Sequence, residues 1–104
     1  MRGTTNAVPA AGGLKVIASG TITGLTSDLQ NLEMPSAALL VIANLYSGSG
    51  TSYMNSAVAL RGSLPVAFDN IIAARIGLSE DGMILSYMGD IPSSNTRIEY
   101  FAFA

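Results

Sequence analysis

The chain has 104 residues and a formal net charge of −2, and it contains no Cys, His or Trp. A chain of this length forms one domain and buries enough surface to fold without disulfides or a structural metal. The missing residue types exclude thiolate zinc sites, disulfide frameworks, histidine metal sites and Ser–His or Cys–His nucleophile pairs. Nucleic-acid binding is not expected without a basic patch, nor is membrane insertion, because the longest apolar run covers only residues 37–43.

Charged residues make up only 12% of the chain, whereas hydrophobic residues make up 49%. Soluble domains usually carry about 25% charged residues. A small monomer with so few charges is poorly protected from association, so this composition indicates that other subunits cover part of the surface. The alternative explanation of the low charge is an uncovered, neutral surface that is rich in Ser, Thr, Asn and Gly.

Residues 1–13 predict a flexible N-terminal arm. The segment has no hydrophobic periodicity and ends in Gly12-Gly13. Pro9 favours an extended conformation of Val8. We expect either a disordered tail or a strap that orders on a neighbouring subunit, with Val8 and Pro9 as anchors. The arm also lacks the apolar stretch of a secretory signal, which favours a protein made in a cytoplasm.

The first predicted strand covers residues 14–23, which are rich in β-branched side chains. Residues 25–34 are ambiguous, because their leucines fit helical spacing, whereas a loop and strand leading to Pro35 is equally compatible. Residues 38–46 are apolar at almost every position, which is typical of a central strand buried on both faces. A flexible turn rich in Ser and Gly follows.

The second half continues the strand pattern. Residues 53–60 place Met54, Ser56, Val58 and Leu60 at alternate positions, and Pro65 interrupts the pattern after them. Residues 70–78 and 83–89 flank a hairpin turn at Ser79–Gly82, and residues 96–104 close the chain. The sequence therefore predicts an all-β fold, an antiparallel, jelly-roll-like β-sandwich of about seven strands over residues 14–104.

The last strand is apolar on two faces. The period of two places Ile98, Tyr100 and Ala102 on one face and Arg97, Glu99, Phe101 and Phe103 on the other. One face joins the core, whereas the other needs cover from a neighbouring subunit or from a loop of the same chain. We therefore predict an interface formed by Val8, Pro9, Tyr100, Phe101 and Phe103.

No residue pattern indicates a catalytic, metal or cofactor site. The carboxylates are dispersed, and the adjacent pair Glu80 and Asp81 lies in the predicted turn. The Gly-rich segment at residues 47–50 lacks the Lys-Ser/Thr of a phosphate-binding loop. The four tyrosines fit a sugar-binding surface, but strand propensity explains them as well. We expect a protein that is not an enzyme and carries no cofactor.

The sequence resembles the small β-sandwich domains of tailed-bacteriophage virion proteins. The resemblance covers most of residues 13–104 and is carried by "GLKVIASGTITGL", "SAALLVIANLYSGSG", "SAVAL", "IAARIGLSEDGMILSYMG" and "RIEYFAF". It implies a virion structural protein, either a capsid decoration (cement) protein or a tail-fibre tip. The partners it implies are a second or third copy of the chain, as a homodimer or homotrimer, and other virion subunits such as the major capsid protein.

The arm and the low charge favour the decoration protein among these alternatives. A fibre tip is usually preceded by trimeric stalk repeats, which this sequence lacks, although its Tyr- and Ser-rich loops are compatible with a host glycan. A cellular adhesin or lectin is the third alternative, and the lack of a secretory signal argues against it.

Overall fold

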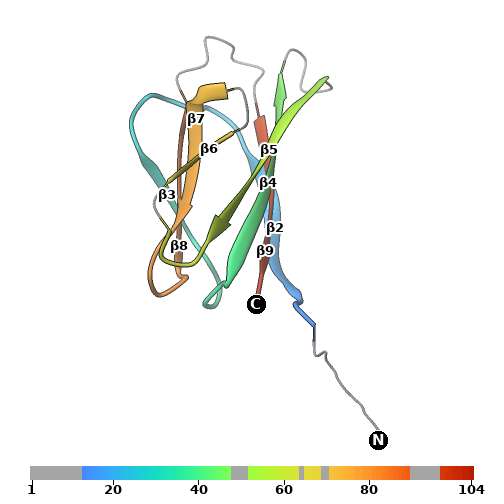
Figure 1. The fold of residues 1–104 in the computed structure, drawn as a ribbon, viewed down its shortest axis with the longest axis vertical. Helices are drawn as coiled ribbons and strands as arrows, with labels where there is room; N and C mark the ends of the chain where they lie inside the picture. Colours follow the sequence, from blue (N-terminus) through green and yellow to red (C-terminus); the bar gives the residue numbers. More distant parts are fainter. Residues whose placement is uncertain (1–12, 48–51, 64, 69–70, 90–96) are drawn as a thin grey trace, which may run out of the picture.

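The computed structural model is a sandwich of two antiparallel β-sheets (Figure 1). It describes residues 13–47, 52–63, 65–68, 71–89 and 97–104, and for residues 47, 52–54 and 71–73 only the backbone. The first sheet contains, in spatial order, β2 (Val16–Ile22), β9 (Arg97–Phe103), β4 (Leu40–Ser47) and β5 (Ser52–Leu60). The second contains β3 (Gln30–Glu33), β8 (Ile84–Gly89), β7 (Ile71–Leu78) and β6 (Val66–Phe68).

The predicted fold class is confirmed. Within the described residues the chain forms eight strands, whereas the sequence indicates about seven. The additional strand is β6, which begins directly after Pro65 at the edge of the second sheet. An edge strand tolerates a neighbouring proline because one of its sides makes no ladder hydrogen bonds.

The core lies between the two sheets and follows the period of two in each strand. Val41, Ala43 and Leu45 of β4 are completely buried, as are Ile98 and Ala102 of the neighbouring β9. The second sheet contributes larger side chains to the same core, Phe68, Ile76, Leu78 and Leu85. Among the residues whose burial the structure describes, six of the fifteen buried hydrophobic ones are alanines, so much of the interior is lined by small side chains.

The ambiguous residues 25–34 form a loop followed by β3. The Gly89 N–H of β8 donates to the Thr26 carbonyl over 2.7 Å, which ties the loop to the second sheet. Leu25 and Leu32 pack against the core, whereas Leu29 is 55% exposed. The tertiary contacts therefore select the strand alternative, and only two of the three helically spaced leucines are used for packing.

The predicted hairpin turn joins β7 to β8. Gly82 has a φ of 74°, and an added Cβ there would lie 2.8 Å from the Ala38 nitrogen and closer still to its carbonyl oxygen. The Asp81 carboxylate accepts hydrogen bonds from the Ser79 hydroxyl, at 2.7 Å, and from the Met83 N–H, at 3.0 Å. These donors, Ser79 first, lower the pKa of Asp81.

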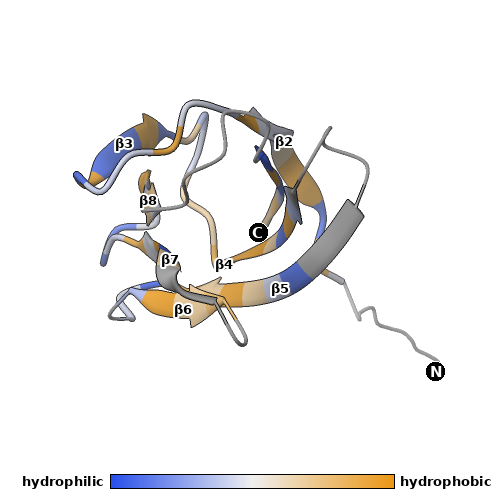
Figure 2. Ribbon diagram, turned by 90° about the horizontal axis from the view of Figure 1, so that it is seen from above, coloured by the Kyte–Doolittle hydropathy of each residue, from blue (hydrophilic) through white to orange (hydrophobic). Residues whose placement is uncertain are grey.

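The two sheets meet along one side of the sandwich, where β5 contacts β6 and β7 (Figure 2). The Gly62 N–H, just after β5, donates to the carbonyl of Leu78 at the end of β7 over 3.0 Å, which adds a hydrogen bond between the two sheets. At the end of the chain, Lys15 and Ala104 exchange two backbone hydrogen bonds of 3.0 Å, and the Phe103 carbonyl accepts from the Leu39 N–H. The C-terminal strand is thus held between β2 and β4.

Candidate interaction surface

The first sheet has an outer face that the described part of the chain leaves open. Neighbouring strands are in register, so that outward-pointing side chains form rows across all four strands. We number these rows from the end of the sheet at which the C-terminus lies. Row 1 consists of Val16, Phe103, Leu40 and Leu60. Row 2 consists of Ser19, Phe101, Ile42 and Val58.

Rows 1 and 2 form a continuous apolar patch interrupted only by Ser19. Val16 and Leu60 are each 55% exposed, Val58 is 45% exposed and Phe101 is 37% exposed. The other aliphatic and aromatic members, Leu40, Ile42 and Phe103, are half-buried. Monomeric proteins rarely expose large contiguous apolar patches, and such patches commonly mark interaction sites. This patch is therefore a candidate interaction surface.

Along β5 and at the end of β9, the outer face carries bulkier side chains than the inner face. On β5, Ala57 and Ala59 point into the core, whereas Val58 and Leu60 point outward. On β9, Ala102 is buried between the outward-pointing Phe101 and Phe103. On these two strands the side chains with the larger apolar surface therefore lie on the face that the described residues leave uncovered.

The polar half of the outer face begins in row 3, which consists of Thr21, Glu99, Asn44 and Ser56. The Ser56 hydroxyl donates to the Asn44 side-chain oxygen over 2.9 Å. Row 4 pairs Tyr46 with Arg97.

The two charges of this polar half are paired with each other. Arg97 Nη2 lies 3.4 Å from Glu99 Oε2, and its guanidinium carbon lies 4.5 Å from the centroid of the Tyr46 ring. The ion pair and the cation–π contact hold the arginine over the sheet. The formal charges of Arg97 and Glu99 cancel, so these two residues leave the outer face without net charge.

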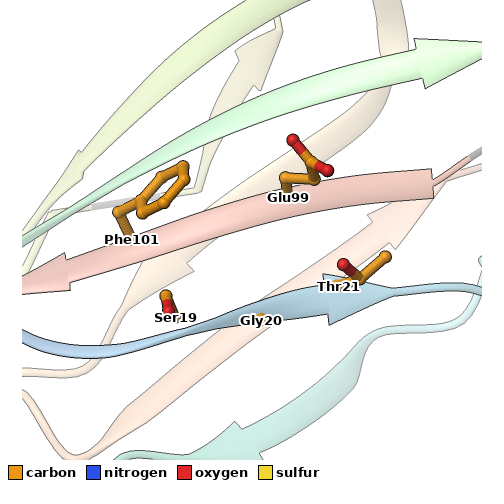
Figure 3. Close-up of a pocket in the computed structure, with 5 residues that line it drawn as sticks. All are labelled: Ser19, Gly20, Thr21, Glu99 and Phe101. Carbon is orange, nitrogen blue, oxygen red and sulfur yellow. The ribbon is translucent and has the colours of Figure 1, made fainter. Parts of the chain in front are cut away.

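A shallow depression lies between β2 and β9 where the apolar and polar halves meet (Figure 3). Its volume is about 220 Å³, and it is lined by Ser19, Gly20, Thr21, Glu99 and Phe101. The depression forms because the short side chains of Ser19 and Thr21 lie beside the long side chains of Phe101 and Glu99. Its size suits one projecting aliphatic side chain or one ring.

The predicted interface residues are divided by the structure. Phe101 and Phe103 lie on the outer face, as predicted from the period of two. Tyr100 points inward and packs against the core, with its hydroxyl over Gly20, where an added Cβ would lie 2.9 Å from it. Tyr100 is therefore separated from the two phenylalanines and is not part of the outer face. Val8 and Pro9 lie outside the described residues.

Sequence reasoning missed the contributions of β2, β4 and β5 to this surface. The sequence of residues 38–46 predicts burial on both faces, yet the described residues bury only the inner face, and Ile42 remains half-buried. The alternation of Val58 and Leu60 does not by itself indicate which way these side chains point. Apolar side chains on both faces of residues 38–46 and of the last strand are the feature of the sequence from which this patch could have been predicted.

Searches of protein-family models, curated proteins and solved structures found no match to this chain. Among the described residues, no group of three or more His, Cys, Asp or Glu side chains is placed to hold a metal ion. The same part of the chain contains no helix long and apolar enough to cross a membrane. Glu80 and Asp81 are exposed in the hairpin turn, as expected.

Proposed function

We propose that this chain is a non-enzymatic structural protein that self-associates through the outer face of the first sheet and decorates a bacteriophage capsid. The observation that carries the self-association is the apolar patch of rows 1 and 2, whose side chains on β5 and at the end of β9 are bulkier than their inward-pointing neighbours. Burial of such surface contributes about 25 cal/mol per Å², so cover by another subunit is favoured.

The size of the outer face fits a modest but specific interface. Four strands spaced about 4.8 Å apart span about 19 Å, and the seven residues of β9 extend over about 24 Å. The flat area is thus about 450 Å² before side-chain relief is counted, somewhat below the roughly 600 Å² per partner at the lower limit of stable interfaces. Association of this strength suits a subunit that gains further contacts within an assembly.

The virion role is supported by the resemblance of residues 13–104 to phage β-sandwich proteins and by the low charged fraction of 12%. In this role the outer face joins copies of the chain, and residues 1–13 bind the capsid with Val8 and Pro9 as anchors. Simultaneous contacts with several capsid subunits supply avidity that one small interface lacks. The protein then resides in the virion after synthesis in the host cytoplasm.

The first experiment measures the mass of the purified chain by light scattering. We expect a dimer or trimer for the natural sequence and a monomer for Leu60→Glu, which introduces a charge into row 1. Leu29→Glu is the matched control, because Leu29 has the same residue type and the same 55% exposure but lies in the loop before β3. A monomeric natural chain, or equal effects of both variants, would refute self-association through the outer face.

Capsid binding is tested by co-sedimentation with capsids that lack decoration. Candidate capsids come from phages whose genomes encode this chain or a close homologue. Removal of residues 1–12 should abolish co-sedimentation without changing the oligomer mass, because the arm and the outer face serve different partners. Unchanged capsid binding by the truncated chain would contradict the strap.

The depression between β2 and β9 favours a second candidate, a receptor-binding module for a glycan. The Phe101 ring offers a stacking surface, and the Glu99 carboxylate can accept hydrogen bonds from sugar hydroxyls. This candidate requires the outer face to remain open. A monomer in light scattering, together with glycan binding that Phe101→Ser abolishes, would support it over self-association.

A further inference from the structure

We propose that the partner on the outer face is a second copy of the chain, related by a two-fold axis that runs parallel to the strands between β4 and β9. This inference rests on the proposed self-association and specifies its geometry. An isologous interface brings the same patch of both subunits together, so the patch has to be complementary to itself. The row pattern of the outer face meets this condition for one axis direction.

The strand order β2-β9-β4-β5 has an even number of strands, so its centre lies between β9 and β4. A two-fold axis along that centre line places β9 on β4 of the second copy and β2 on β5 of the second copy. Because the axis is parallel to the strands, each row stays at its own level and faces the same row of the other subunit. Sheets packed face to face keep such alignment to within about 30°.

In this arrangement the apolar rows meet each other. In row 1, Val16 faces Leu60 of the second copy, and Phe103 faces Leu40 of the second copy. In row 2, Phe101 faces Ile42 of the second copy. Residues 38–46 are then covered on both faces, which matches the two-sided apolar pattern of their sequence.

The depression between β2 and β9 receives a side chain of the second copy in the same arrangement. Val58 of the second copy faces Ser19, the small residue that interrupts row 2. Val58 is 45% exposed on its own chain, so its side chain is free to project into the depression beside Phe101. A protruding aliphatic group thus meets a recess of about 220 Å³ at two symmetric places in the interface.

The polar rows are compatible with the same axis. Glu99 faces Asn44 of the second copy, whose amide group can donate to the carboxylate, and Arg97 faces Tyr46 of the second copy. No charge faces a like charge. Arg97 already makes a cation–π contact with Tyr46 within one chain, and the same type of contact between subunits is favourable.

A two-fold axis across the strands does not give this complementarity. If that axis passed through the middle of the face, it would place row 1 on row 4, set the charged Arg97 on Phe103 of the second copy and keep the apolar rows from meeting each other. If it were shifted to bring only rows 1 and 2 together, it would leave half of the face uncovered. The axis parallel to the strands is therefore the arrangement that the register favours.

The test uses single cysteines, which is straightforward because the natural chain contains none. Ser19→Cys and Val58→Cys replace exposed side chains with small ones, and both variants should keep the thermal midpoint of the natural chain. Equal amounts are mixed, allowed to exchange and treated with a bismaleimide spanning about 10 Å, the usual distance between packed sheets. We expect several-fold more cross-linked dimer in the mixture than in either variant alone.

The geometry explains this difference. Residue 19 of one subunit lies opposite residue 58 of the other, whereas the two copies of residue 19 lie at opposite edges of the interface. Three strand spacings and the distance between sheets separate them by about 17 Å, beyond the linker. Ser27→Cys, in the exposed loop between β2 and β3, is mixed with Val58→Cys as a control and should not cross-link.

The outcomes separate this inference from the proposed function. A stable dimer in which Ser19→Cys alone cross-links most efficiently would place β2 over β2 and overturn the parallel axis while preserving self-association. A trimer by light scattering would also overturn the two-fold arrangement. A monomer would refute the self-association on which the inference rests.

Discussion

Asp81 shows how one side chain fixes the connection between β7 and β8. Its carboxylate accepts from the Ser79 hydroxyl and the Met83 N–H, while the Ile84 N–H donates to the Ser79 hydroxyl oxygen over 3.0 Å. The turn is therefore closed by side-chain acceptors next to Gly82, the residue that adopts the left-handed conformation. Asp followed by Gly is a frequent turn pair for this reason.

This network predicts a pH dependence of stability. Because the pKa of Asp81 is lowered in the folded protein, its carboxylate stabilises the fold above the ordinary titration range of an aspartate and loses this effect as the pH falls below about 4. We expect Asp81→Asn to melt at a lower temperature than the natural chain at pH 7, with the difference vanishing near the acid end of the folded range. Calorimetric melts across the acidic range would check this, and a difference independent of pH would contradict it.

At the scale of the strand, position on the inner or outer face decides what a side chain contributes to folding. Leu45 of β4 is completely buried, whereas Leu60 of β5 is 55% exposed on the outer face. Both are leucines in neighbouring strands of one sheet. Leu45 therefore contributes to the stability of the fold, whereas Leu60 is available to contribute to association.

Alanine substitution at these two positions should therefore have different effects. Leu45→Ala should lower the free energy of unfolding by about 2–5 kcal/mol because it leaves a cavity in the core. Leu60→Ala should lower it by less than about 1 kcal/mol in a solution dilute enough to dissociate the oligomer. Urea titration at low protein concentration measures both values, and similar losses would show that the outer face is packed within one chain.

The same distinction explains how much the sequence could predict. Alternation along a strand is a local property, so the faces of residues 97–103 and the turn at Ser79–Gly82 were predictable. The assignment of residues 25–34 to a loop and strand depended on the tertiary hydrogen bond from Gly89 to Thr26. The rows of the outer face depended on strand order, which places β9 between β2 and β4 and which no local pattern encodes.

At the scale of the whole molecule, folding and association are coupled if the outer face is covered by another copy. A partner that binds only the folded chain stabilises it by mass action. We expect the thermal midpoint of the natural chain to rise by about 3 °C for each tenfold increase in protein concentration. The Leu60→Glu variant should melt at one temperature at all concentrations, and a concentration-independent midpoint for the natural chain would argue against coupled association.

The reciprocal hydrogen bonds between Lys15 and Ala104 have a further consequence for how this domain can be combined with other proteins. The chain enters and leaves the sandwich at adjacent points, about one strand spacing of 4.8 Å apart. A host protein could therefore accept residues 14–104 within a surface loop without spreading the two sides of that loop. The sandwich is in this sense a module that can be inserted as well as appended.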